Sequence, residues 1–253
     1  MKILVWGCGT MASAFVQGLA RSHEELEFIC WNPSVEKAQT LAAKVSGRVL
    51  KDSQVLPTVD AVILGFKPQK LAEAAPALSK LTAGTTVISL LAAVGVARLQ
   101  TFFPAASVIR VMPNLAVAFG QGVVLWHGTS EVWGKFFQSL GLAPLVSERL
   151  MDVYTLHAGC SPAFLFAWID EATKFAVKNG GEAELARKIL IKAWQGAIVG
   201  LESDPLNMQQ KINEVASIGG VTRAALDGFA QCAPDYIEQG FAAGLRRIQE
   251  LKS

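Results

Sequence analysis

A glycine-rich turn near the amino terminus is the first stretch whose residue types could do chemistry. Gly7-Cys8-Gly9-Thr10-Met11-Ala12 matches G-x-G-x-x-G/A, directly follows the apolar run Lys2–Trp6, and opens a segment with helical spacing. In such a turn one glycine permits the tight bend, the next lets the backbone approach a pyrophosphate, and a small third residue lets the helix pack on the strand. The motif predicts dinucleotide binding through Gly7, Gly9, Thr10, Met11 and Ala12. A glycine turn without a ligand is the alternative.

The end of the second strand-like run indicates which dinucleotide binds. NAD-dependent enzymes usually carry Asp or Glu there, bonded to the ribose 2′-hydroxyl. The stretch here, Cys30-Trp31-Asn32-Pro33-Ser34, holds no carboxylate. Asn32 and Ser34 offer hydrogen-bond donors and Lys37 adds a positive charge, which favours NADP(H), with NADH still possible. Asn32 or Ser34 could instead cap the following helix, and both roles can hold together.

Two further stretches each end an apolar run in the first half of the chain. Phe66-Lys67-Pro68 closes the run Ala61–Phe66, and Arg110-Val111-Met112-Pro113-Asn114 closes the run Val108–Met112. The carboxyl ends of strands form the ligand crevice of an open α/β sheet. We therefore expect both stretches where cofactor and substrate meet.

Two more stretches open helices in the second half. Gly159-Cys160-Ser161-Pro162-Ala163-Phe164 begins the first long helix there, with the proline suited to a first helical turn. Ser217-Ile218-Gly219-Gly220-Val221-Thr222 begins a later helix, whose free backbone amides could bind a carboxylate. Helix capping by Ser217 or Thr222 is the alternative.

Together these stretches resemble the pyrroline-5-carboxylate reductase family, whose members are NAD(P)H-dependent enzymes that make proline. The resemblance runs nearly end to end, and its most diagnostic motif is a Ser-Pro-Gly-Gly-x-Thr signature at Ser217–Thr222. The other matching stretches are Gly7–Ala12, Phe66–Pro68, Ser89–Ala93, Arg110–Asn114 and Gly159–Phe164. The chain departs from the family at Ile218, which replaces the signature proline, and at Lys174, where the family usually has an acidic residue.

The resemblance implies that NADPH gives a hydride to the C=N bond of a small cyclic imine. It places the pyrophosphate on Gly9–Met11 and the nicotinamide near Phe66, Lys67, Pro68, Met112 and Pro113. The substrate would be bound by Ser217, Gly219, Gly220, Val221 and Asn114. We expect the Thr222 hydroxyl to hydrogen-bond the ring nitrogen, as the catalytic residue. A cyclic imine can enter already protonated, so a dedicated acid is not required.

The elements that must position these residues alternate through the first half. Continuous apolar runs without polar alternation are typical of parallel strands covered on both faces. Strands are expected at Lys2–Trp6, Glu27–Trp31, Ala61–Phe66, Thr85–Leu90, Val108–Met112, Val123–Trp126 and Pro144–Ser147. Helices are expected at Met11–Ala20, Val35–Ala43 and Glu131–Leu140. This order predicts an α/β fold with a Rossmann-type doubly wound parallel sheet.

The second half reads as helical throughout. Helices are expected at Met151–Ala158, Pro162–Asn179 and Glu182–Leu201, with two more across Val221–Leu251. We expect an NADP-binding domain at residues 1–149 and a helical domain at 150–253 that binds substrate and forms a homodimer or a higher homo-oligomer.

Composition excludes several other classes of protein. The 253 residues are 51% hydrophobic and 17% charged, which rules out disorder. A net charge of +2 without a block of like charge gives no footprint for nucleic acid. The longest apolar stretch, Val87–Ala97, is too short to cross a membrane, and we expect that the apolar run after Met1 is not a signal peptide. The scattered cysteines and histidines predict no metal site, and a cytoplasmic location is expected.

Two other functions remain open from the sequence. An NADP-dependent imine or ketone reductase with a different substrate could use the same two-domain plan, and Ile218 motivates that alternative. A non-catalytic NADP-binding protein would bind the cofactor without turnover. Lys67, Asn114 and Thr222 argue against this second alternative.

Overall fold

The structure is a computed structural model that describes residues 1–53, 55–78, 80, 84–203, 207–232 and 235–252. The chain divides into two compact units. The first comprises Met1–Cys160 and Gly244–Ser253, and the second comprises Ser161–Ala243. The domain boundary expected after residue 149 stays a prediction.

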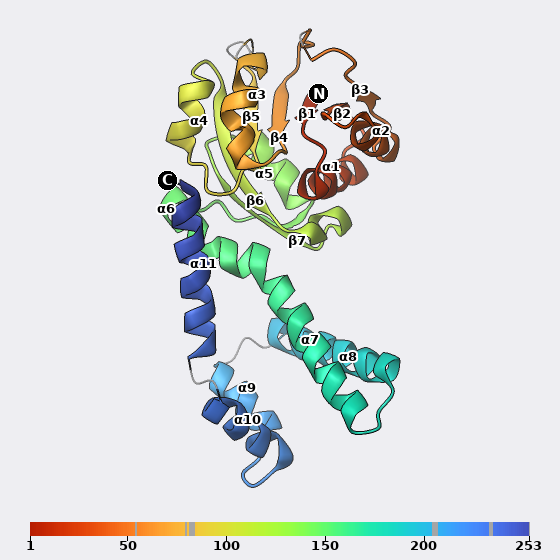
Figure 1. Ribbon diagram of the computed structural model, residues 1–253, viewed down its shortest axis with the longest axis vertical. Helices are drawn as coiled ribbons and strands as arrows, with labels where there is room; N and C mark the ends of the chain where they lie inside the picture. The colour runs from red at the N-terminus through yellow and green to blue at the C-terminus, as the bar shows by residue number, and fades with distance from the viewer. Residues whose placement is uncertain (54, 79, 81–83, 204–206, 233–234, 253) are drawn as a thin grey trace. The chain divides into compact units, whose positions relative to one another are not determined.

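An eight-stranded sheet forms the centre of the first unit (Figure 1). Its order is β3-β2-β1-β4-β5-β6-β7-β8. The strands are β1 Lys2–Trp6, β2 Glu27–Trp31, β3 Arg48–Val49, β4 Ala61–Leu64, β5 Thr86–Ser89, β6 Ser107–Pro113, β7 Gly122–His127 and β8 Gly141–Leu142. Every pair is parallel except β6 with β7, which is antiparallel. The predicted Rossmann-type fold is confirmed as a mostly parallel sheet.

The prediction of a strand at Pro144–Ser147 is wrong. The eighth strand is Gly141–Leu142 instead, and only Leu145 of the expected stretch joins the sheet, through an isolated parallel bridge to Trp126. Gly141 has φ +129° and passes so close to Gly122 that a side chain would meet its backbone oxygen. That close approach sets the pairing, and an apolar run does not reveal it.

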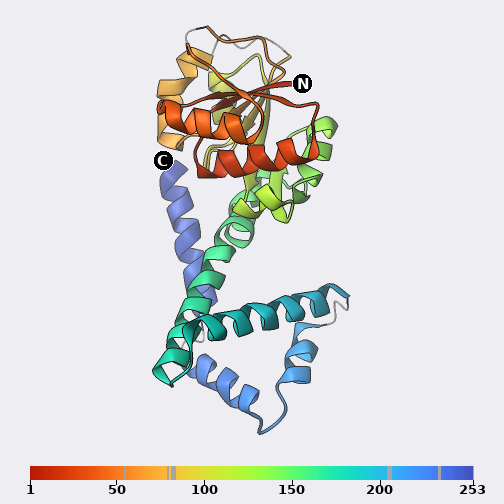
Figure 2. The ribbon, with the colours of Figure 1, turned by 90° about the vertical axis from the view of Figure 1, so that its right-hand side faces the viewer.

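Helices cover both faces of the sheet (Figures 1 and 2). On one face α1 Thr10–Ser22, α2 Val35–Lys44 and α5 Glu131–Gln138 pack against Ile3 and Val5. On the other face α3 Leu71–Leu78 and α4 Val96–Phe102 pack against Leu4 and Trp6. Because neighbouring residues of β1 enter different clusters, the strand is buried on both sides, as its unbroken apolar sequence predicts.

Short helices connect the strands to the rest of the first unit. The sequence did not predict the 3₁₀ turns Pro68–Lys70 and Leu115–Phe119. The predicted helix Met151–Ala158 is instead α6 Glu148–Thr155 followed by a π-helical turn, Leu156–Cys160.

The second unit, over its described residues, contains helices and no strand. They are α7 Ser161–Lys178, α8 Ala183–Ser203, α9 Met208–Val215, α10 Val221–Cys232 and the first part of α11 Tyr236–Lys252. The sequence did not predict α9. Large apolar side chains such as Phe166, Phe175 and Val199 lie exposed on this unit. Across the described chain, none of the helices has both the length and the apolarity that crossing a bilayer needs.

Candidate functional site

The glycine turn after β1 is held tightly against the end of β4. Gly7 adopts φ +101°, and a Cβ there would lie 2.7 Å from the Gly65 carbonyl carbon and 2.8 Å from the Phe66 nitrogen. A Cβ on Gly65 would in turn lie 2.4 Å from the Ala12 Cβ. The small residues of the motif are therefore required by the close approach of two backbones.

Helix α1 begins at this turn without a side chain that caps its first amides. Gly9 is its N-cap residue, no side chain caps it, and no acidic residue stands in its first turn. The first helical hydrogen bond runs from the Ser13 amide to the Gly9 carbonyl, 2.8 Å. The amides of Thr10, Met11 and Ala12 consequently lack partners within the helix. A glycine cradle with free amides fits the diphosphate of a dinucleotide.

Asn32 fastens the end of β2 to the glycine turn. Its Oδ1 accepts a hydrogen bond from the Cys8 amide, 3.0 Å, and its Nδ2 donates to the Ser34 carbonyl, 3.1 Å. The Gly7 amide also donates to the Trp31 carbonyl, 2.8 Å. Asn32 therefore holds the glycine turn in its shape.

Ser34 stands at the N-cap position of α2, but its side chain does not cap the helix. Its hydroxyl donates instead to the carboxylate of Glu36, 2.7 Å from Oγ to Oε2. That hydrogen bond lowers the pKa of Glu36, so the carboxylate is charged at neutral pH. Sequence reasoning used Lys37 and Ser34 at this helix start but missed Glu36, which follows Ser34. Its place two residues later, in the first turn of the helix, was the available signal.

The two predicted stretches at strand ends differ in exposure. Phe66 is half-buried, Lys67 is exposed and Pro68 begins the 3₁₀ turn after β4. At the end of β6, Pro113 is buried and Met112 half-buried. The Asn114 amide is buried, donates to the Ala158 carbonyl at 3.0 Å and accepts from the Val123 amide at 3.2 Å. Asn114 thus ties the end of β6 to β7 and to the π-helical turn.

A buried ionic cluster supports the start of the Arg110–Asn114 stretch. The Arg110 guanidinium is 2% exposed and lies 3.0 Å from Asp152 Oδ1 and 3.6 Å from Glu148 Oε1. Lys252 also pairs with Asp152. Glu148 Oε1 additionally accepts the Val96 amide, 2.7 Å, at the start of α4. The cluster joins α6, α4 and the last turn of α11 to the strand.

The same cluster sets the charge of Asp152. Burial alone would raise the pKa of this carboxyl, but the hydrogen bonds from Lys252 and Arg110 outweigh burial and hold the pKa below its ordinary value. Asp152 is therefore a charged, paired group of the folded state.

In the second unit, Ser217–Thr222 forms a tight turn that opens α10. Gly219 has φ +74°, the Gly220 amide donates to the Ser217 carbonyl at 3.0 Å, and a Cβ on Gly220 would lie 2.6 Å from Ser217 Oγ. The first helical bond runs from the Ala224 amide to the Gly220 carbonyl, 3.1 Å. The preceding amides, including those of Val221 and Thr222, lie in an exposed first turn. The geometry suits a bound carboxylate.

Arg223 holds this turn in place. Its Nη2 donates to Asn213 Oδ1 at 3.0 Å and to the Ala216 carbonyl at 3.3 Å. Ile218, the departure from the family signature, is fully exposed. Lys174, the other departure, pairs with Asp170 and Glu171 on α7, 2.7 Å in each case.

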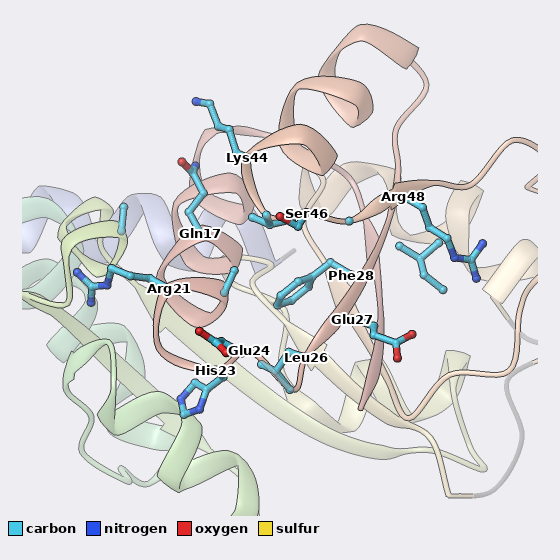
Figure 3. A pocket seen from close by; sticks show the side chains of 15 residues that line it. Gln17, Arg21, His23, Glu24, Leu26, Glu27, Phe28, Lys44, Ser46 and Arg48 are labelled. Atoms are coloured by element: carbon cyan, nitrogen blue, oxygen red, sulfur yellow. The ribbon is translucent and has the colours of Figure 1, made fainter.

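A hollow of about 810 Å³ lies away from the predicted site (Figure 3). It is lined by the end of α1, the start of β2 and the segment after α2, with charges of both signs from Arg21, Glu24, Glu27, Lys44 and Arg48. These parts lie at the amino-terminal edge of the parallel strands, whereas the glycine turn lies at the carboxyl edge. None of the predicted site residues lines this hollow.

Two family profiles match the chain. A profile described as pyrroline-5-carboxylate reductase dimerisation matches residues 148–251, and one described as NADP oxidoreductase coenzyme F420-dependent matches residues 2–93. Over the described residues, no group of three or more His, Cys, Asp or Glu side chains could hold a metal ion.

Similar proteins match over nearly the whole chain. The pyrroline-5-carboxylate reductase of Haemophilus influenzae is 31% identical over 261 residues, covering 98% of this chain and 96% of that protein. Pyrroline-5-carboxylate reductase 2 of Bacillus subtilis is 30% identical over 89% of this chain and 85% of its own length. The crystal structure of 1-pyrroline-5-carboxylate reductase from Streptococcus pyogenes has a TM-score of 0.86 at 27% identity and covers 100% of this chain and 98% of that one.

Proposed function

This chain belongs to the pyrroline-5-carboxylate reductase family, and from that premise we propose that it reduces the C=N bond of 1-pyrroline-5-carboxylate with NADPH to give proline. The observation that carries the proposal is the 31% identity over 98% of the chain. The glycine cradle at one end of the sequence and the Ser217–Thr222 turn at the other support it.

The residues of the first unit bind and orient the cofactor in this proposal. The amides of Thr10, Met11 and Ala12 bind the diphosphate, and Asn32 holds their turn in shape. The residues that would hold the nicotinamide are Phe66, Lys67, Pro68, Met112 and Pro113. When bound, NADPH supplies the hydride that the imine carbon receives.

The residues of the second unit bind the substrate. Amides at Gly219 and Val221, with Ser217, hold its carboxylate, whereas the Gly220 amide donates to the Ser217 carbonyl and keeps the turn closed. The buried Asn114 of the first unit keeps the end of β6 in place. The Thr222 hydroxyl hydrogen-bonds the ring nitrogen and so fixes which carbon is presented. The iminium form arrives with its proton, so binding and orientation account for the contribution of the protein.

The family profile for dimerisation and the exposed apolar side chains of the second unit support a homodimer or a higher homo-oligomer. We propose that the enzyme acts in the cytoplasm. Three of the four thiols, Cys8, Cys30 and Cys160, are unpaired, which suits a reducing compartment.

The test is a comparison of substrates by NADPH oxidation, with proline identified as the product. We expect the highest kcat/KM with 1-pyrroline-5-carboxylate. A higher kcat/KM with another cyclic imine or an oxo acid would assign a different reductase activity. Stabilisation by NADPH in a thermal-shift assay without turnover of any of these compounds would assign a binding protein.

A further inference from the structure

The start of α2 carries an acid where the start of α1 carries none. Both helices begin at the carboxyl edge of the sheet, after the neighbouring strands β1 and β2. The first turn of α1 is free of acidic residues, whereas the first turn of α2 contains Glu36. The start of α1 therefore attracts an anion, whereas the negative charge of Glu36 repels an anion from the start of α2.

Glu36 accepts the hydrogen bond of the Ser34 hydroxyl, which a phosphate on the adenosine ribose would otherwise accept. Ser34 Oγ donates its proton to Glu36 Oε2 at 2.7 Å, and the carboxylate is fully exposed and charged. A 2′-phosphate bound at the end of β2 would compete for that hydroxyl, next to a like charge. A 2′-hydroxyl carries no charge, so it meets no such repulsion.

We propose that Glu36 is a specificity-determining residue that lowers the preference of this chain for NADPH over NADH. The inference rests on the proposed function only in taking the end of β2 as the place of the adenosine ribose. Lys37 follows in the same exposed first turn, so a carboxylate and an ammonium group oppose one another there. Neutralising Glu36 leaves the lysine unopposed and frees the Ser34 hydroxyl.

The test is to measure Kd for NADPH and for NADH by titration of the full chain, in parent and Glu36→Gln proteins. We expect Glu36→Gln to tighten NADPH about two- to five-fold, the size of one charge at a helix start, with Kd for NADH nearly unchanged. The gain should shrink at high salt, because exposed charges are screened. Ser34→Ala should weaken NADPH selectively.

Glu131→Gln is the matched control. Glu131 also lies in the first turn of a helix behind a serine N-cap, but β7 is antiparallel to β6, which puts the start of α5 at the opposite edge of the sheet. It should leave both Kd values unchanged. An unchanged NADPH-to-NADH ratio in Glu36→Gln, or an equal gain for both cofactors, would overturn the proposal. These titrations need no turnover, so they decide it even if 1-pyrroline-5-carboxylate is not the substrate.

Discussion

Thr222 is the residue on which the proposed chemistry most directly depends. Its exposed hydroxyl stands in the first turn of α10, next to the amides proposed for the carboxylate. Thr222→Ala should lower kcat/KM about ten- to a hundred-fold, since a hydrogen bond to a charged group is lost, while Thr222→Ser should retain most activity. Thr101→Ala, which removes an exposed hydroxyl bonded to the Arg98 carbonyl, is the control. An unchanged kcat/KM in Thr222→Ala would show that Thr222 takes no part in the reaction.

Asp152 gives the first unit a pH-dependent share of its stability. Because its folded-state pKa is lowered, the stabilisation is present above the ordinary carboxyl pKa, about 4, and is lost as pH falls through the lower folded value. Asp152→Asn leaves Arg110 without its closest partner. This variant should lower the free energy of unfolding, measured in urea at neutral pH, by about 3 kcal/mol.

The difference in free energy of unfolding between parent and Asp152→Asn should become smaller as the pH falls below the ordinary carboxyl pKa, about 4. The control is Glu73→Gln, which breaks the exposed Lys70–Glu73 pair, 2.6 Å, and should leave the unfolding midpoint close to that of the parent. A gap between parent and Asp152→Asn that stays constant with pH would show that the ionised form of Asp152 is not what stabilises the fold.

At the scale of elements, the glycine turn is the part that a single methyl group should disable. Gly7→Ala places a Cβ 2.7 Å from the Gly65 backbone at φ +101°, so the turn must shift and NADPH binding should weaken at least ten-fold, with a loss of about 1–3 kcal/mol in stability. Gly84→Ala is matched in backbone angle, φ +99°, but meets no atom within 4 Å. It should lose stability without losing cofactor affinity in the same titration. Equal NADPH affinities in Gly7→Ala and Gly84→Ala would show that the glycine turn does not bind the cofactor.

The sequence predicted those elements whose burial is complete and local. The strands Lys2–Trp6 and Glu27–Trp31 are confirmed residue for residue, because their apolar runs end sharply at polar or glycine residues. It did not predict α3, which has Pro76 inside it, or the two-residue strand β3, which is too short for a periodic signal. Pairing and contacts across the fold, such as the bridge at Leu145 and the reach of Glu36 to Ser34, depend on geometry that spacing does not encode.

At the scale of the whole molecule, the second unit has too little buried apolar surface of its own. Its longest helices, α7 and α8, bury Thr173 alone among their side chains. Ile198 is 52% exposed and, with Phe166 and Trp194, lines an apolar hollow of about 520 Å³ between the two helices. Exposed apolar surface of this extent is typical of an interface.

Ile198→Asp should therefore convert the oligomer into monomers, because a charge placed in a desolvated interface has no partner. Sedimentation equilibrium should show the mass of a dimer or larger assembly for the parent and a mass near 27.0 kDa for the variant. Val132→Asp is the control, since it places the same charge at an exposed apolar position on α5 of the first unit and should leave the mass unchanged. A parent that sediments as a monomer would contradict the proposed homo-oligomer. An Ile198→Asp variant that stays assembled would show that the interface does not include this hollow.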